Sequence, residues 1–150
     1  MSLPLLMAGM VDTLTPLLSP MKVKAHGGQF TEREIALLLG DSPAVLIAAL
    51  GLDSFGPNDE LNGYQTKGRF AAYCIGAATA TETSTEYAMA AAQTVINALL
   101  ADQTWGVPAL CQPPELTSIA AEAVYSGHIN ILSVAIWAVT WTQNFEFTRI

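Results

Sequence analysis

Apolar residues recur every four positions from Leu6 to Leu14, and this spacing predicts a helix over residues 3–18. Pro16 predicts that the helix ends or bends near Leu14, because proline has no amide hydrogen to donate. Polar and apolar residues alternate over residues 21–25, which predicts a short strand with its lysine side chains in water.

Two more helices are predicted from their N-terminal signals. Thr31, with a glutamate three residues later, forms a capping box, and the helix that it begins is predicted to end at Gly40. Ser84 or Thr85 is the predicted N-cap of a longer helix that continues to about Leu100. An apolar residue at every fourth position gives this longer helix a continuous buried side.

Apolar runs predict the strands of a sheet. Residues 44–50 are apolar throughout, which indicates a buried strand. Residues 68–78 alternate so that both faces are largely apolar, as in a central strand that is covered on both sides. Residues 51–65 lie between them and are rich in Gly, Pro, Asn and Asp, so they predict either a long surface loop or a hairpin arm.

The last part of the chain predicts two strands, residues 116–125 and 130–142, joined by a tight hairpin turn at residues 126–128. Both faces of the last strand are apolar, so one face is expected to pack on the helices and the other to meet a second subunit. Together the elements predict one α+β domain over residues 1–150. Its mixed or antiparallel sheet of about four to five strands is expected to pack against two to three helices.

The composition adds an expectation of self-assembly. Half of the residues (51%) are hydrophobic and only 13% are charged, against about a quarter charged in ordinary soluble domains. So few charges leave apolar surface to be buried against another copy of the chain. Trp137 and Trp141 share one face of the last strand with Val139, and aromatic residues dominate interface hot spots. This triplet is the candidate subunit interface, with core packing as the alternative.

The acidic balance excludes one class of partner. A net charge of −7 opposes nucleic acid binding, which depends on neutralising phosphates. Asp53, Asp59 and Glu60 make the segment after the first long strand acidic, and it is the candidate loop for contacting a basic patch on a partner protein. The same carboxylates offer acid–base chemistry or a hard-cation site as alternatives, although their spacing matches no calcium loop.

The sequence contains no motif for catalysis, metal binding or cofactor binding. Neither a nucleophile elbow, nor a P-loop, nor a dinucleotide-binding glycine turn is present. His26 and His128 are isolated from other ligand types and are predicted to be exposed turn histidines. Cys74 is predicted to be a small core residue, and neither it nor Cys111 belongs to a Cys-x-x-Cys pair. We therefore expect a non-enzymatic protein without cofactor or metal.

A cytoplasmic location is expected. The apolar N-terminal segment has no basic residue before Lys22 and is interrupted by Asp12, unlike a signal peptide. The apolar runs at residues 43–52 and 131–141 are too short to span a bilayer. The absence of a disulfide framework also suits a reducing compartment.

Four segments of the sequence resemble the small tail-completion proteins of Mu-like bacteriophages and prophages, which are similar in architecture to tail terminators such as the lambda minor tail protein U. The segments are Phe30–Ile35, Ser42–Leu46, Gly68–Tyr73 and the helix that contains Glu86–Ala88. The resemblance implies a structural subunit that forms a ring, typically of six copies, and caps the tail tube. It implies tail-tube and head-completion proteins as partners, no catalytic residues, and a location in the host cytoplasm and the virion.

Two other functions stay open at this point. The first is a small-molecule binding module with a pocket near Tyr73, Trp105 and Cys111. The second is an enzyme that uses the carboxylates between Asp53 and Glu60. Fold alone does not decide among these functions.

Overall fold

The computed structural model describes residues 3–26, 44–58, 63–77, 83–101, 103–107, 111–129 and 132–148. In chain order the elements are α1 (Leu3–Leu18), β1 (Lys22–His26), β2 (Ala44–Asn58), β3 (Gly63–Ala77), α3 (Ser84–Leu100), the 3-10 turn η1 (Leu116–Ser118), β4 (Ala120–Ile129) and β5 (Leu132–Thr148). The predicted helix from Thr31 to Gly40 lies outside the described residues, as do Asp59 and Glu60.

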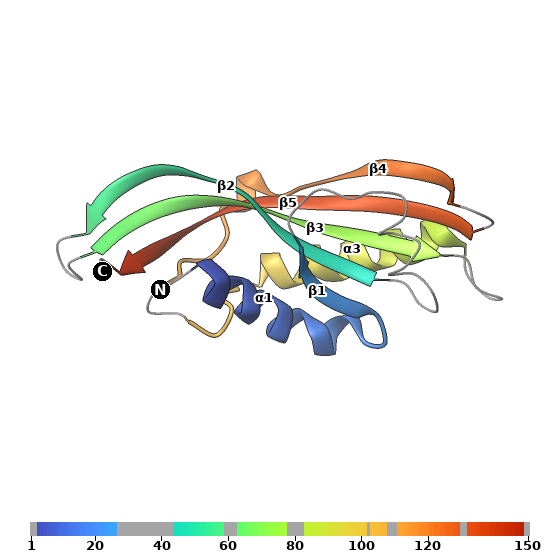
Figure 1. The fold of residues 1–150 in the computed structure, drawn as a ribbon, viewed down its shortest axis with the longest axis horizontal. Coiled ribbons are helices and arrows are strands. Elements are labelled where there is room, and N and C mark those ends of the chain that lie inside the picture. Colours follow the sequence, from blue (N-terminus) through green and yellow to red (C-terminus); the bar gives the residue numbers. More distant parts are fainter. Residues whose placement is uncertain are drawn as a thin grey trace.

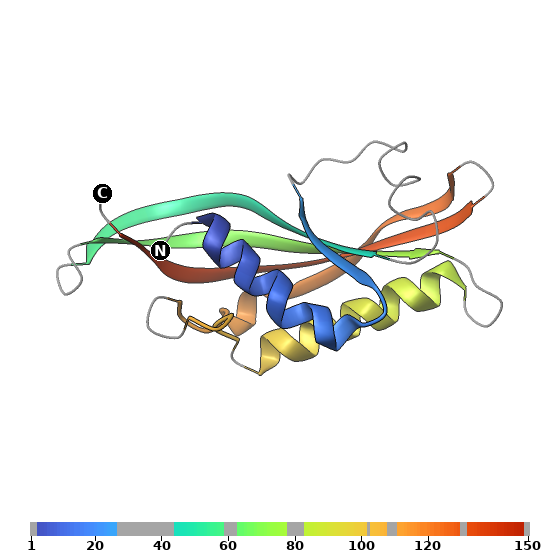
Figure 2. The same ribbon diagram turned by 60° about the horizontal axis from the view of Figure 1, so that its bottom comes forward.

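The strands form one mixed sheet in the order β1-β2-β3-β5-β4. β1 is parallel to β2, and every other neighbouring pair is antiparallel. Both α1 and α3 lie against the same side of the sheet (Figure 1), and Figure 2 brings this helical layer forward. The prediction of a single α+β domain, with a mixed or antiparallel sheet of about four to five strands packed against two to three helices, is confirmed, and the sheet is the mixed, five-stranded form.

The segment after residue 50 is a hairpin arm rather than a loop. Residues 51–58 continue β2 and pair with residues 63–69 of β3, and β5 runs alongside for the whole length. The three strands extend past both helices at one end of the sheet (Figure 1). Register shifts at 49–51 and 53–55 mark β-bulges, which increase the local twist and accommodate the glycine-rich sequence of this arm.

The sheet is apolar on both faces, as the alternation of residues 68–78 predicted. On the helical side Phe70, Ala72 and Cys74 of β3 belong to one core cluster with α1 and α3. On the opposite side Ile75 and Ala77 are buried in a second, smaller cluster with residues of β2 and β5. Burial on both faces explains why this central strand reads as a nearly continuous apolar run.

Of the two outcomes predicted from Pro16, an end near Leu14 is wrong, because α1 continues through the proline to Leu18. The proline removes the hydrogen bond that residue 16 would donate to the carbonyl of Asp12, and both residues are exposed at the surface of the helix. Leu14 and Leu18 are both buried in the core, so tertiary packing stabilises the last turn.

The predicted hairpin turn at residues 126–128 is also wrong. Ser126, Gly127 and His128 continue β4 and pair with residues 135, 134 and 133 of β5. The start of the predicted strand is instead the 3-10 turn η1, and β4 begins at Ala120. Turn-forming residue types are tolerated here because β4 is an edge strand, where a glycine loses little packing.

α3 is capped by Thr83 rather than by Ser84 or Thr85. The backbone amide of Glu86 donates to the Thr83 hydroxyl oxygen over 3.1 Å, and the hydroxyl in turn donates to the Glu86 carboxylate over 3.2 Å. The Thr-x-x-Glu spacing from Thr83 to Glu86 is the signal that distinguishes this threonine from its neighbours. Ser84 itself is buried, with its hydroxyl 3.0 Å from that of Ser133 on β5.

Loss of this cap gives a first test. Thr83→Ala is expected to lower the free energy of unfolding by about 1 kcal/mol, because the amide of Glu86 loses its acceptor. The matched control is Thr85→Ala, two residues later on the exposed side of the same helix turn, which is expected to change stability by less than about 0.5 kcal/mol. Urea denaturation measures both variants, and equal costs for the two would show that Thr83 is not the cap.

Candidate functional site

The predicted interface triplet lies inside the chain. Val139 and Trp141 are fully buried in the core cluster beneath α1 and α3, and Trp137 is half-buried against the same cluster. The Trp141 ring lies 5.8 Å from the ring of Phe70 and 6.1 Å from that of Trp105, in tilted contacts. Val139 and Trp141 therefore offer no surface to a second subunit, which corrects that prediction. The helices cover this face of β5, and core packing was the right alternative.

A buried glutamine organises the centre of this aromatic cluster. The indole nitrogens of Trp105 and Trp141 both donate to Oε1 of Gln143, over 2.8 and 3.2 Å. Nε2 of Gln143 donates to the backbone carbonyls of Gln103 and Gln112, over 2.8 and 2.7 Å. Every hydrogen-bonding position of the amide is thus satisfied, as a fully buried polar group requires. These hydrogen bonds hold the segment between α3 and η1 against β5, so Gln143 stabilises the fold.

Trp105 is held in an unusual backbone conformation. Its φ is +54° and that of Gly106 is +79°, and Val107 donates to the carbonyl of Thr104 over 3.0 Å to close the turn. A bulky residue with positive φ is strained, and the burial and hydrogen bond of its indole offset this cost. α1 approaches the turn so closely that a Cβ on Gly9 would lie 2.6 Å from the Trp105 carbonyl oxygen.

The predicted ligand pocket near Tyr73, Trp105 and Cys111 does not exist as one site. Trp105 and Cys111 belong to the core on the helical side, whereas Tyr73 packs against the cluster on the opposite face of the sheet. Burial raises the pKa of the thiols of Cys74 and Cys111 to about 12. Both thiols therefore stay protonated at neutral pH and are unsuited to nucleophilic attack.

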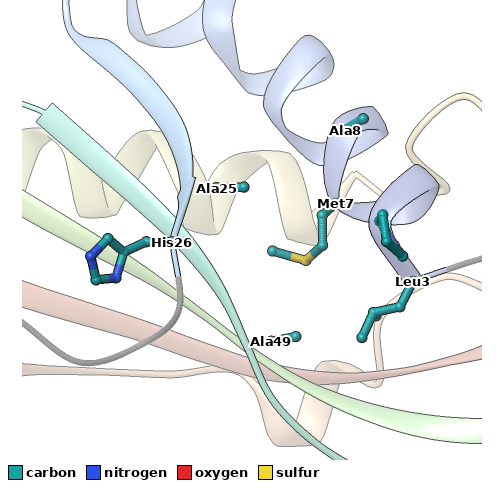
Figure 3. A pocket seen from close by; sticks show the side chains of 7 residues that line it. Leu3, Met7, Ala8, Ala25, His26 and Ala49 are labelled. Atoms are coloured by element: carbon teal, nitrogen blue, oxygen red, sulfur yellow. The ribbon is translucent and has the colours of Figure 1, made fainter.

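An apolar groove of about 550 Å³ opens elsewhere, between the start of α1 and the end of β1 (Figure 3). Its lining residues are Leu3, Pro4, Met7, Ala8, Ala25, His26 and Ala49. His26 is thus the last residue of a strand, and not a turn histidine as predicted. The described lining residues offer hydrophobic contact and one imidazole, and no carboxylate or thiol is among them.

Two of the described surface carboxylates form ion pairs. Asp53 lies on β2, and its Oδ2 accepts from Nε of Arg69 over 2.8 Å at the surface. Lys67 and Glu115 form a second pair at 2.9 Å. Hydrogen bonds from Lys67 and from Thr142 hold the pKa of the Glu115 carboxyl below its usual value. Across the described residues no three His, Cys, Asp or Glu side chains come together as a metal site.

The feature of the structure best suited to a partner is the outer edge of β4. Residues 120–124 are all exposed, and Val124 is 47% exposed at a β-bulge between Ala123 and Tyr125. Ala121 and Ala123 point to the helical side of the sheet, since they pair with residues 139 and 137, yet both are exposed and neither of the described helices covers them. An exposed edge strand presents unpaired backbone donors and acceptors and is a template for another strand. Sequence reasoning missed this edge because strand order is not visible in the chain.

The outer surface of the helices is also poor in charge. Within α1 and α3 the only charged residues are Asp12 and Glu86. Four large apolar side chains of these helices are exposed: Leu5, Leu17, Met89 and Leu100. Isolated surface helices usually carry many charges on the side away from the core, so this pattern is typical of a surface that another protein covers.

Comparison of the sequence with protein-family models and with curated proteins finds no match. The fold itself defines the structural class of the protein, a single α+β domain with an open sheet edge. Within the part of the chain that the structure describes, no helix combines the length and apolarity that a bilayer crossing requires.

Proposed function

We propose that the chain is a structural assembly subunit: a ring-forming tail terminator or head–tail completion protein of a phage or prophage, which caps the tail tube. The observation that carries the proposal is the exposed edge of β4, whose only charged residue is Glu122, together with the nearly uncharged outer surface of α1 and α3. Such a surface favours stable contact with protein over exposure to water. The resemblance of four sequence segments to tail-completion proteins supplies the biological context.

The arm supports the same function. β2, β3 and β5 extend past the helices and give the subunit a second surface, at the far end from β4 (Figures 1 and 2). A subunit in a ring contacts its two neighbours through two different surfaces, and a tail-capping ring also needs a surface for the tube. The edges of the sheet are suited to the contacts with neighbouring subunits, and the arm is a separate surface for the tube.

Imaging of tails tests this function. In a phage or lysogen that carries the gene, its deletion is expected to give tails of abnormal length that are not joined to heads, and a plasmid copy of the wild-type gene should restore normal particles. Electron microscopy of negatively stained lysates measures tail length and head attachment. Normal tails joined to heads in the deletion strain would overturn the proposal.

The groove at α1 and β1 favours a second candidate function, the binding of a small apolar molecule. Ala8→Trp would fill the groove, while Ala90→Trp places the same side chain on the exposed side of α3 as a control. If the groove binds a ligand, a compound that raises the melting temperature of the wild type and of Ala90→Trp should fail to do so for Ala8→Trp. No shift with any compound of a broad apolar library would count against this function.

A further inference from the structure

The two outer edges of the sheet carry side chains of opposite charge. Lys22 and Lys24 are exposed on β1, and Glu122 is the only acidic residue of β4. In the described part of the chain no ion pair involves any of these three side chains, whereas Lys67 and Arg69 on β3 are each paired with a carboxylate. The basic edge and the acidic edge are therefore both available to a partner.

The charges of the two edges lie on the same face of the sheet and in the same row of paired residues. Lys24 pairs with Leu46, and Leu46 pairs with Tyr73. Tyr73 pairs with Ala138, and Ala138 pairs with Glu122. Directly paired residues point to the same face of a sheet. Lys24 and Glu122 are thus the two ends of one row that crosses all five strands, on the side away from α1 and α3.

The strand directions also fit a joint between copies. β1 and β2 run in the same direction, and each following strand of the sheet, β3, β5 and then β4, runs opposite to the one before it. β1 and β4 therefore run in opposite directions. When a second copy continues the sheet in the same orientation, its β1 comes to lie antiparallel to β4 of the first. A closed ring has no translation along its axis. With strands that run close to that axis, the row ending at Glu122 meets the row beginning at Lys24 of the next copy.

We infer that the partner of the β4 edge is the β1 edge of a second copy of this chain, paired antiparallel, with Glu122 opposite Lys24. This assignment rests on the proposed ring function and names its subunit joint. β4 is regular from Ala120 to Ala123, before its bulge, and β1 spans five residues, so each joint is short. A short joint is weak alone, and closure of the ring, in which every copy makes two joints, makes assembly cooperative.

Disulfide trapping tests the register of the joint. In the full chain, Glu122→Cys combined with Lys24→Cys is expected to give a ladder of dimers, trimers and larger species under copper phenanthroline oxidation, since opposed residues of antiparallel strands meet the distance requirement. Glu122→Cys with Ala25→Cys is the matched control, because Ala25 is exposed but points to the other face of β1. The buried native thiols, with a pKa of about 12, should not react.

Three results of the trapping experiment would overturn the joint. The first is the absence of a ladder for the Glu122/Lys24 pair up to the solubility limit of the protein. The second is efficient dimerisation of Glu122→Cys alone, which would mean that β4 pairs with β4 of a second copy. A ladder of equal strength for the Ala25 control would also overturn it, because the linkage would then come from unspecific collision.

Charge reversal tests the same joint without cross-linking. Glu122→Lys alone, and Lys22→Glu with Lys24→Glu in one chain, should each weaken self-association about tenfold, because like charges then face each other. Mixed in equal amounts, the two variants should recover wild-type association, since every joint between unlike chains again has opposite charges. Analytical ultracentrifugation over a concentration series measures both effects, and a mixture that associates no better than its components would overturn the assignment.

The two proposals fail in distinguishable ways. Trapping and charge reversal report the joint in purified protein, whereas tail length and head attachment report the function in a cell. A ladder in vitro together with normal tails in the deletion strain would leave the joint standing and remove the tail function. If the deletion strain has abnormal tails and a gene carrying Glu122→Lys alone restores them fully, the proposed tail function is supported and the proposed joint is contradicted.

Discussion

Gln143→Leu is expected to lower the free energy of unfolding by about 3–5 kcal/mol, one of the largest single-residue effects in this chain. Leucine has a similar volume, so little cavity forms, but four polar groups lose their partner. These are the indole N–H groups of Trp105 and Trp141 and the carbonyls of Gln103 and Gln112, all bonded to the buried amide. Urea denaturation followed by tryptophan fluorescence measures the loss.

Gln93→Leu is the matched control for this variant. Gln93 is exposed on α3, so the same chemical change there is expected to cost less than about 0.5 kcal/mol. Trp105→Phe separates one bond of the network, and in combination with Gln143→Leu it should show a coupling energy of about 1 kcal/mol or more. A cost below about 1 kcal/mol for Gln143→Leu would show that water or rearrangement satisfies these groups.

The elements with strong local periodicity could be predicted from the sequence. The stripe along α3 and the two-sided alternation of residues 68–78 are local patterns. The range of α3 was predicted correctly apart from its cap, and the strand was found although β3 begins earlier, at Gly63. The arm was left between two alternatives, because Gly56 and Pro57 are poor strand residues. This segment forms a strand because it pairs with β3, which in turn pairs with β5. β4 likewise continues through Ser126 and Gly127 because both pair with β5, although these residue types locally indicate a turn.

The candidate site was less accessible to sequence reasoning. The two faces of β5 were assigned correctly, yet the sequence does not say which of two apolar faces the helices cover, and Trp141 proved to be core. Gln143 has no local signal, since its four partners come from three separate segments of the chain. The exposed charge of Glu122 gains meaning only from strand order, which places it at the opposite edge from Lys24.

Gly76→Ala is expected to destabilise the protein by about 3 kcal/mol, through overpacking between β3 and α3. A Cβ at this position would overlap the carbonyl oxygen of Ser84 and would lie 2.8 Å from the backbone nitrogen of Ala88. These are backbone atoms of a helix, so no side chain can rotate away. The first turn of α3 must move as a unit, which also disturbs the contact between the hydroxyls of Ser84 and Ser133.

Gly56→Ala provides the control, because a Cβ on Gly56 in the arm meets no atom within 4 Å. There the substitution should cost less than about 0.5 kcal/mol, and reduced freedom of the unfolded chain favours a slight gain. Urea denaturation of both variants, followed by circular dichroism at the helix band, measures the difference. Similar stabilities for Gly76→Ala and Gly56→Ala would mean that α3 can shift on the sheet at little cost. The position of α3 on the sheet would then not depend on its close contact with Gly76.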